Sequence, residues 1–142
     1  GSYLASCLEK IPAEFHPDIH FIGRQPREKV VELFNRAAVV VLPSVIESFG
    51  MVAIEAMACG APTVFGACGP HAEIIDDGVN GLICDPMLPA DIAGKTLELL
   101  ERRDYATEMG LAARTRVKER FTPQRLLQQS QDFYESVITS RR

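Results

Sequence analysis

Two glutamates stand eight positions apart in the segment ESFGMVAIEA, residues 47–56. Glu47 precedes a turn that contains Gly50, and Glu55 follows within a very apolar stretch. A carboxylate can accept hydrogen bonds from two adjacent hydroxyls. A glycine turn at a helix start lets backbone N–H groups approach an anion. The segment therefore indicates a site for a ligand with a diol at each end of an anion, such as ribose, diphosphate and a second sugar ring.

Spacing alone also allows a structural interpretation, with Glu55 as a salt-bridged helix residue and Glu47 as a solvated loop residue. The helix predicted over 50–59 is apolar on every face, which is typical of a buried helix. A lone buried carboxylate is costly unless it is paired or hydrogen-bonded. No Lys or Arg lies between Ala37 and Gly94. We therefore expect Glu55 to meet either a distant cation or a ligand diol.

The predicted elements that position these residues alternate between strands and helices. Strands are predicted at 19–23, 39–43, 62–66 and 81–85, and helices at 3–14, 26–37, 50–59, 71–78, 89–102, 104–120 and from 123 onward. Short, wholly apolar strands are typical of a parallel sheet that is buried on both faces. The pattern predicts an α/β, Rossmann-like parallel sheet of about four strands with helices on both faces.

The carboxyl ends of the predicted strands carry the chemically loaded loops. In open parallel sheets, ligands bind at this edge, where loops 43–50 and 67–73 fall. A doubly wound domain usually has five or six strands, so we expect one or two N-terminal strands to be missing from this chain. We interpret Gly1-Ser2 as an expression scar, and residues 89–142 as a helical C-terminal region.

Composition excludes several functional classes. The net charge of −4 argues against a nucleic-acid partner. No apolar run approaches the ~18 residues of a membrane span. The four cysteines have no CxxC spacing, so we expect reduced thiols, a cytoplasmic location and no metal site. The C-terminal stretch is rich in basic residues. We interpret it as a solvated helix face, with peripheral contact to an anionic membrane as the alternative.

Residues 19–121 closely resemble the C-terminal domain of family 4 glycosyltransferases, the retaining group-1 class with the two-domain GT-B fold. The E-x7-E signature of that family matches Glu47 and Glu55. The segments EAMACGAPTV (55–64) and DGVNGL (77–82) match its flanking pattern. The resemblance implies the donor-binding half of a hexosyltransferase that uses a nucleotide-sugar, together with an acceptor that the sequence does not name.

The resemblance also implies roles for single residues. Glu55 is expected to bind the ribose hydroxyls of the donor. Glu47 is expected at the donor sugar as the catalytic residue that supports oxocarbenium-like charge. Arg24 and Gln25 lie where the backbone of the family meets the nucleobase. The remaining substrate-binding candidates are residues of the loop and helix start: Ser48, Phe49, Gly50, Met51 and Val52. No metal and no cofactor are implied.

Two departures from the family pattern qualify these expectations. The Arg/Lys pair that stabilises the departing diphosphate lies on an earlier strand and loop, which this chain lacks, as it lacks the acceptor-binding N-terminal domain. We therefore expect the chain to be inactive alone. The usual Gly-Gly of the second loop is Gly69-Pro70. Because proline removes an N–H, sugar contacts at this loop, including any by His71, are in doubt.

Rival functions remain open from the residues themselves. A non-catalytic nucleotide-sugar-binding module would keep Glu55 and could lose Glu47. A sugar-phosphate-accepting synthase of the same family would keep both. A glycoside hydrolase also uses two carboxylates, but these usually come from different strands and flank one bond, which the placement of Glu55 within a helix disfavours.

Overall fold

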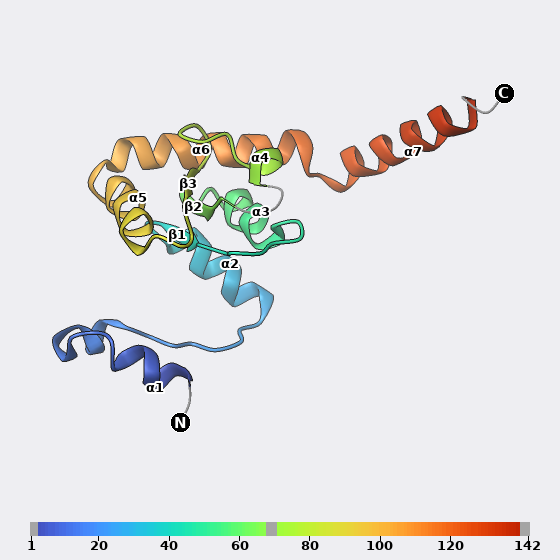
Figure 1. Ribbon diagram of the computed structural model, residues 1–142. Coiled ribbons are helices and arrows are strands. Elements are labelled where there is room, and N and C mark those ends of the chain that lie inside the picture. Colours follow the sequence, from blue (N-terminus) through green and yellow to red (C-terminus); the bar gives the residue numbers. More distant parts are fainter. Residues whose placement is uncertain (1–2, 68–70, 140–142) are drawn as a thin grey trace. The chain divides into compact units, whose positions relative to one another are not determined.

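The structure is a computed structural model that describes residues 3–67 and 71–139 (Figure 1). It divides into two compact units, residues 1–30 and 31–142, each described here by itself. The first unit contains helix α1 (Tyr3–Leu8) and a 3₁₀ helix (Ala13–Asp18). Helix α2 (Arg27–Arg36) begins in the first unit and continues into the second.

The second unit is built on a parallel sheet of three described strands in the order β1-β2-β3. These are β1 (Val40–Leu42), β2 (Thr63–Gly66) and β3 (Leu82–Cys84). Val41 pairs with Val64, and Phe65 pairs with Ile83. The other elements of the unit are helices: α3 (Met51–Ala58), α4 (His71–Ile74), α5 (Pro89–Glu101), α6 (Arg103–Arg120) and α7 (Pro123–Thr139). The predicted α/β fold with a parallel sheet is confirmed.

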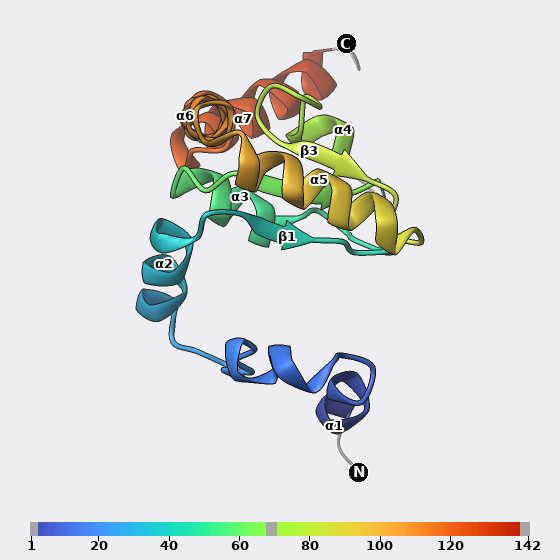
Figure 2. The ribbon, with the colours of Figure 1, turned by 90° about the vertical axis from the view of Figure 1, so that its left-hand side faces the viewer.

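Helices cover both faces of the sheet. Successive side chains of the buried strand β2 point to opposite sides, and each side packs against a different helix. Phe65 packs in a cluster with Ile54 and Met57 of α3. Val64 packs on the other side with Leu99 of α5. Figure 1 shows α5 and α3 on opposite sides of the strands, and in Figure 2 α5 lies in front of them. Helix α6 contributes to both clusters, so it ties the two layers together.

Glycines set the end of α3 and its approach to α6. Gly60 has a φ of +78°, and the N–H groups of Gly60 and Ala61 donate to the carbonyls of Met57 and Ala56. This is the glycine-terminated helix end known as the Schellman motif, and it confirms the predicted stop at Gly60. A Cβ added at Gly110 of α6 would lie 2.2 Å from the Gly60 carbonyl oxygen, so the two backbones touch there.

Several element boundaries differ from the sequence expectations. The strand predicted at 19–23 is absent among the described residues, because extended backbone becomes a strand only when a neighbouring strand pairs with it. The helix predicted at 3–14 ends at Leu8, and the chain resumes as a 3₁₀ helix after Pro12. Helix α4 ends at Ile74 instead of Gly78 because the Asn80 side chain takes over the next backbone groups.

The burial expected for strand β1 is also only partly correct. Val40 is buried, but the Val41 side chain is 36% exposed. β1 forms one edge of the described sheet, so Val41 has a neighbouring strand on one side only. The helix break predicted at 122–123 is confirmed. The Arg125 N–H donates to the Thr122 hydroxyl at 3.4 Å, and Pro123 begins α7.

Candidate functional site

The first predicted loop, residues 43–50, leaves the carboxyl end of β1 and enters α3. The end of β2 lies directly against it, because a Cβ added at Gly66 would fall 2.5 Å from the Ser44 carbonyl oxygen. Only glycine permits this approach. The beginnings of the two loops, after β1 and after β2, are therefore neighbours at one edge of the sheet, where parallel α/β folds bind their ligands.

The turn at Gly50 leads directly into the first residue of α3. Gly50 has φ +82° and ψ +36°, in the left-handed region, and it is the residue before the first helical position. A Cβ there would lie 3.0 Å from Ile74 Cδ1 and 3.2 Å from Phe65 Cζ. No side chain caps the helix start, so the first N–H groups of α3 are available to an anion. Met51 and Val52 are half exposed at this end.

Glu47 lies on the loop that precedes this turn. Its Oε1 accepts a hydrogen bond from the backbone N–H of Ser48 at 3.1 Å, and its side chain is partly buried. The contact holds one carboxylate oxygen close to the loop backbone and leaves the other without a described partner. Such a carboxylate can still accept hydrogen bonds from a ligand hydroxyl.

Phe49 connects the loop to the C-terminal helices. Its ring stands edge-on to the ring of Phe121, with centroids 6.3 Å apart and an interplanar angle of 81°. Phe121 packs against the cluster that contains Ile54 and Ile74. No sequence pattern predicts this contact, because 71 residues separate the two rings in the chain.

Glu55 departs from the sequence expectation in its surroundings. Helix α3 is not buried all round, since Met51 and Val52 are 56% and 47% exposed. Glu55 lies on this less buried side and is itself partly buried. The prediction that Glu55 is a deeply buried carboxylate is therefore wrong. Even so, no side chain among the described residues forms an ion pair or a hydrogen bond with Glu55.

The pKa of the Cys59 thiol, one turn along α3, responds to two nearby charges. Burial raises this pKa, Arg114 of α6 lowers it, and Glu55 raises it. Glu55 and Arg114 thus both act on the same thiol, one turn after Glu55 on α3. Arg114 makes no ion pair with Glu55 in the described part of the chain. The carboxylate remains available to a ligand.

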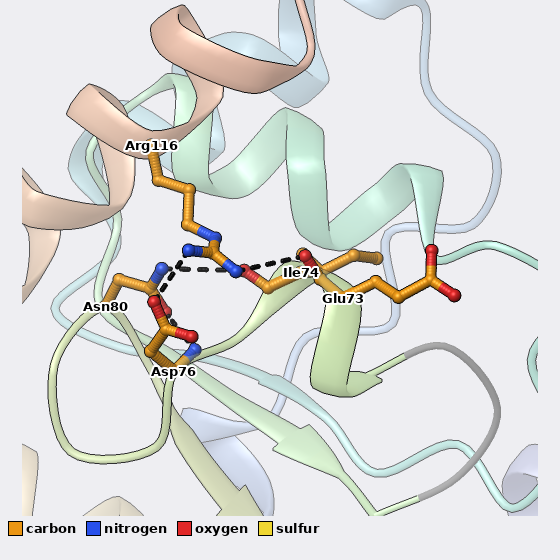
Figure 3. A network of polar contacts seen from close by, with 5 residues as sticks. All are labelled: Glu73, Ile74, Asp76, Asn80 and Arg116. Carbon is orange, nitrogen blue, oxygen red and sulfur yellow. Dashed lines mark hydrogen bonds and ion pairs between the residues drawn. The ribbon is translucent and has the colours of Figure 1, made fainter. Parts of the chain in front are cut away.

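Behind the second loop, Arg116 of α6 holds the end of α4 (Figure 3). Its Nη1 donates to Asp76 Oδ2 at 2.6 Å, and its Nη2 donates to the Glu73 carbonyl oxygen at 3.1 Å. The Glu73 carboxylate points away from Arg116 in Figure 3. Sequence reasoning missed Arg116, because it is 40 positions after Asp76 in the chain and its helix is rich in other basic residues.

The other predicted residues belong to the first unit or to the second loop. Arg24 and Gln25 belong to the first unit, where the Gln25 side-chain amide donates to the Ile22 carbonyl oxygen. Gly69-Pro70 lies outside the described residues, and His71 is described only as the first residue of α4. The described residues contain no group of three or more His, Cys, Asp or Glu side chains that could hold a metal ion. Over the same residues, no helix combines the length and apolarity needed to cross a membrane.

Comparisons with known proteins give this geometry a family. Residues 8–116 match the model of the family described as glycosyl transferases group 1. The D-inositol 3-phosphate glycosyltransferase of Corynebacterium kroppenstedtii is 35% identical over 122 residues, which is 86% of this chain and 27% of that protein. The chain spans between 18% and 30% of the length of the curated relatives it matches.

Solved structures share the fold. A sucrose-phosphate synthase from Thermosynechococcus elongatus superposes with a TM-score of 0.84 at 26% identity, over 96% of this chain and 34% of that one. HepE of Anabaena, solved in complex with UDP, gives a TM-score of 0.70 at 27% identity, over 74% of this chain and 29% of that one. The observed fold is the C-terminal half of a GT-B architecture, and the chain belongs to the glycosyl transferases group 1 family.

Proposed function

We propose that this chain is the donor-binding part of a retaining glycosyltransferase of family 4, which transfers a hexose from a nucleoside diphosphate sugar to an acceptor. One observation carries the proposal: the open start of α3 at Gly50 stands between two carboxylates, Glu47 and Glu55, that the rest of the described chain leaves able to accept hydrogen bonds. An anion-binding helix start with one diol acceptor before it and one after it in the chain matches sugar, diphosphate and ribose in their chemical order.

Each part of the donor then has a partner in the loop. The N–H groups of Met51 and Val52 face the diphosphate, and the helix dipole favours its negative charge. Glu55 accepts from the ribose hydroxyls. Glu47 lies at the sugar, where a carboxylate supports the positive charge that develops as the diphosphate departs. Ser48 and Phe49 complete the wall of the sugar pocket.

Two further residues extend the proposal beyond the loop. Arg24 and Gln25 are proposed to meet the nucleobase. The backbone donors and the helix dipole stabilise the leaving group without a metal or cofactor.

The names of similar proteins support a nucleotide-sugar and leave the acceptor open. HepE binds UDP in its crystal structure, which makes UDP the first nucleotide to test here. The names of the other relatives differ in kind: one is an inositol phosphate glycosyltransferase and the other a sucrose-phosphate synthase. Because the chain covers only part of these proteins, we propose that the acceptor site and the basic residues for the diphosphate lie on another part of the enzyme. The 142 residues alone would then be inactive.

A second candidate function has a specific observation behind it. The sucrose-phosphate synthase matches 96% of this chain, so a synthase that uses a sugar phosphate as acceptor is the favoured alternative. A non-catalytic nucleotide-sugar-binding module would need Glu55 but not Glu47.

We also propose a cytoplasmic location, because Cys7, Cys59 and Cys84 are free thiols and thiols persist in reducing compartments.

The proposal is tested by titrating the chain with UDP, GDP, ADP and their glucose or mannose adducts while the amide shifts of residues 48–55 are recorded by NMR. We expect shifts that saturate, with one base preferred and additional shifts at Glu47 and Ser48 when the sugar is attached. Equal responses to inorganic diphosphate and to every nucleotide would contradict a donor site. An absence of shifts here, repeated with a longer chain of the same protein, would overturn it.

A further inference from the structure

Arg116 makes two directed contacts to the end of α4. Its guanidinium donates to the Asp76 carboxylate at 2.6 Å and to the Glu73 carbonyl oxygen at 3.1 Å (Figure 3). The side chain is only 15% exposed, and its Nε is buried without a hydrogen-bond partner among the described residues. A planar fork that donates to two acceptors at once fixes their separation, which a lysine cannot do.

The turn that follows α4 is tied down as well. Asn80 is 2% exposed, and its Oδ1 accepts from the Asp76 N–H at 2.8 Å. The Ile83 N–H of β3 donates to Asp77 Oδ1 at 2.8 Å. The Tyr105 hydroxyl of α6 donates to the Gly78 carbonyl oxygen at 2.9 Å. The far end of α4 is therefore held by the sheet and by α6, independently of the loop that enters the helix.

Ile74 carries this constraint from α4 to the donor loop. It lies between Glu73 and the turn and is fully buried. A Cβ added at Gly50 would fall 3.0 Å from Ile74 Cδ1, so the Ile74 side chain forms the floor beneath the Gly50 turn. Any shift of α4 along α6 would change the space in which Gly50 adopts its left-handed conformation.

The part of α6 that carries Arg116 is packed into the core. Ala113 and Val117, on either side of Arg116 along α6, are buried in the same cluster as Ile54 of α3 and Ile74 of α4. Close-packed interiors transmit displacements because they contain little free space. Arg116, Ile74 and Gly50 therefore form one continuous path of contacts from α6 to the start of α3.

We propose that Arg116 is a positioning residue for the donor site. By holding Glu73 and Asp76, it fixes the position of Ile74 beneath Gly50, and this fixes the direction of the N–H groups that belong to the start of α3. The inference rests on the proposed function, since it concerns donor N–H groups that the diphosphate would meet. Arg116 does not touch the donor, and its effect is transmitted through packing.

The test compares Arg116→Gln and Arg116→Lys with Lys118→Gln. Lys118 is an exposed cation on the same helix and takes no part in the contacts of Arg116 with Glu73 and Asp76. Three quantities are measured in each variant: the amide shift of Gly50 without ligand, the Kd of UDP, and the thermal midpoint. We expect Arg116→Gln to move the Gly50 amide and to weaken UDP binding about tenfold, since small misplacements of binding groups have effects of this size or larger. Arg116→Lys should lie between it and the wild type.

The possible outcomes distinguish a failure of the Arg116 role from a failure of the proposed donor function. A lower thermal midpoint with an unchanged Gly50 amide and an unchanged Kd in the folded variant would make Arg116 merely structural and overturn the proposal. The same shift and loss of affinity in Lys118→Gln would also overturn it, because the effect would then be one of net charge. If the wild type binds no nucleotide, the donor function fails, and the ligand-free Gly50 shift still decides whether Arg116 positions the turn.

Discussion

The ring of Phe49, on the loop that leads into α3, packs edge-on against the ring of Phe121, the residue that follows α6. The centroids are 6.3 Å apart and the planes meet at 81°. The loop before α3 is thus in contact with the segment between α6 and α7. The orientation of the loop depends on where α6 stops.

Replacing either ring should reveal this dependence. We expect Phe49→Leu and Phe121→Leu each to lower the free energy of unfolding. A double-mutant cycle should give a coupling of about 0.5–1.5 kcal/mol, the usual range for edge-to-face aromatic pairs. The cycle is measured by urea unfolding. Phe133→Leu, on an exposed part of α7, serves as the control and should show no coupling with Phe49. Additive effects of Phe49 and Phe121 would mean that the contact contributes nothing.

The Gly50 turn gives a second prediction. Gly50→Ala should destabilise the protein by about 1–2 kcal/mol, because a non-glycine residue is strained in the left-handed region, and the added Cβ would press on Ile74 and Phe65. Gly94→Ala is the matched control. Gly94 lies within α5 with nothing within 4 Å of its added Cβ, so alanine there should stabilise by about 0.5–1 kcal/mol. Denaturant unfolding of both variants checks the prediction, and equal signs would contradict it.

Sequence patterns predicted the α/β class and the end of α3 well because both depend on local signals. Apolar runs mark β1 and β2, a glycine ends α3 at Gly60, and the E-x7-E spacing marks the loop. The strand at 19–23 failed for the opposite reason. Its residues have the composition of a strand, but a strand forms only when it pairs with a neighbouring strand. A short stretch of sequence does not show whether such a neighbour exists.

Burial was harder to predict than the elements themselves. The all-apolar composition of α3 suggested burial on every side, yet Met51 and Val52 are among its more exposed residues. A helix at the edge of a binding loop carries apolar residues on its open side, and composition does not distinguish that from a core position. Contacts between distant segments, such as Arg116 with Asp76, leave no periodic signal at all.

Glu55 should dominate the affinity for the nucleoside diphosphate. Glu55→Gln keeps the shape of the side chain but removes the charge. It should weaken binding about tenfold, in line with the loss of a hydrogen bond to a charged group. Glu55→Ala should weaken binding further. Calorimetric titration with UDP measures both, and Glu108→Gln, on the exposed side of α6, controls for net charge. Wild-type affinity in both Glu55 variants would remove the residue from the ribose site.

Glu47 should act on turnover more than on nucleotide affinity. The Ser48 N–H donates to its Oε1, and a glutamine at this position can still accept that hydrogen bond, so Glu47→Gln preserves the loop while removing the negative charge. In the full-length enzyme we expect kcat to fall by about 10²–10³-fold, as when a preorganised group that stabilises transition-state charge is lost.

The Kd of UDP separates the catalytic role of Glu47 from a structural one. It should stay within about twofold of the wild type in Glu47→Gln, because the carboxylate is assigned to the sugar and not to the nucleotide. Glu47→Ala removes the contact with Ser48 as well and should reduce both kcat and UDP affinity, since the loop then loses an internal hydrogen bond. If Glu47→Gln instead retains full turnover and Glu47→Ala does not, the residue shapes the loop and the developing charge is met by another group.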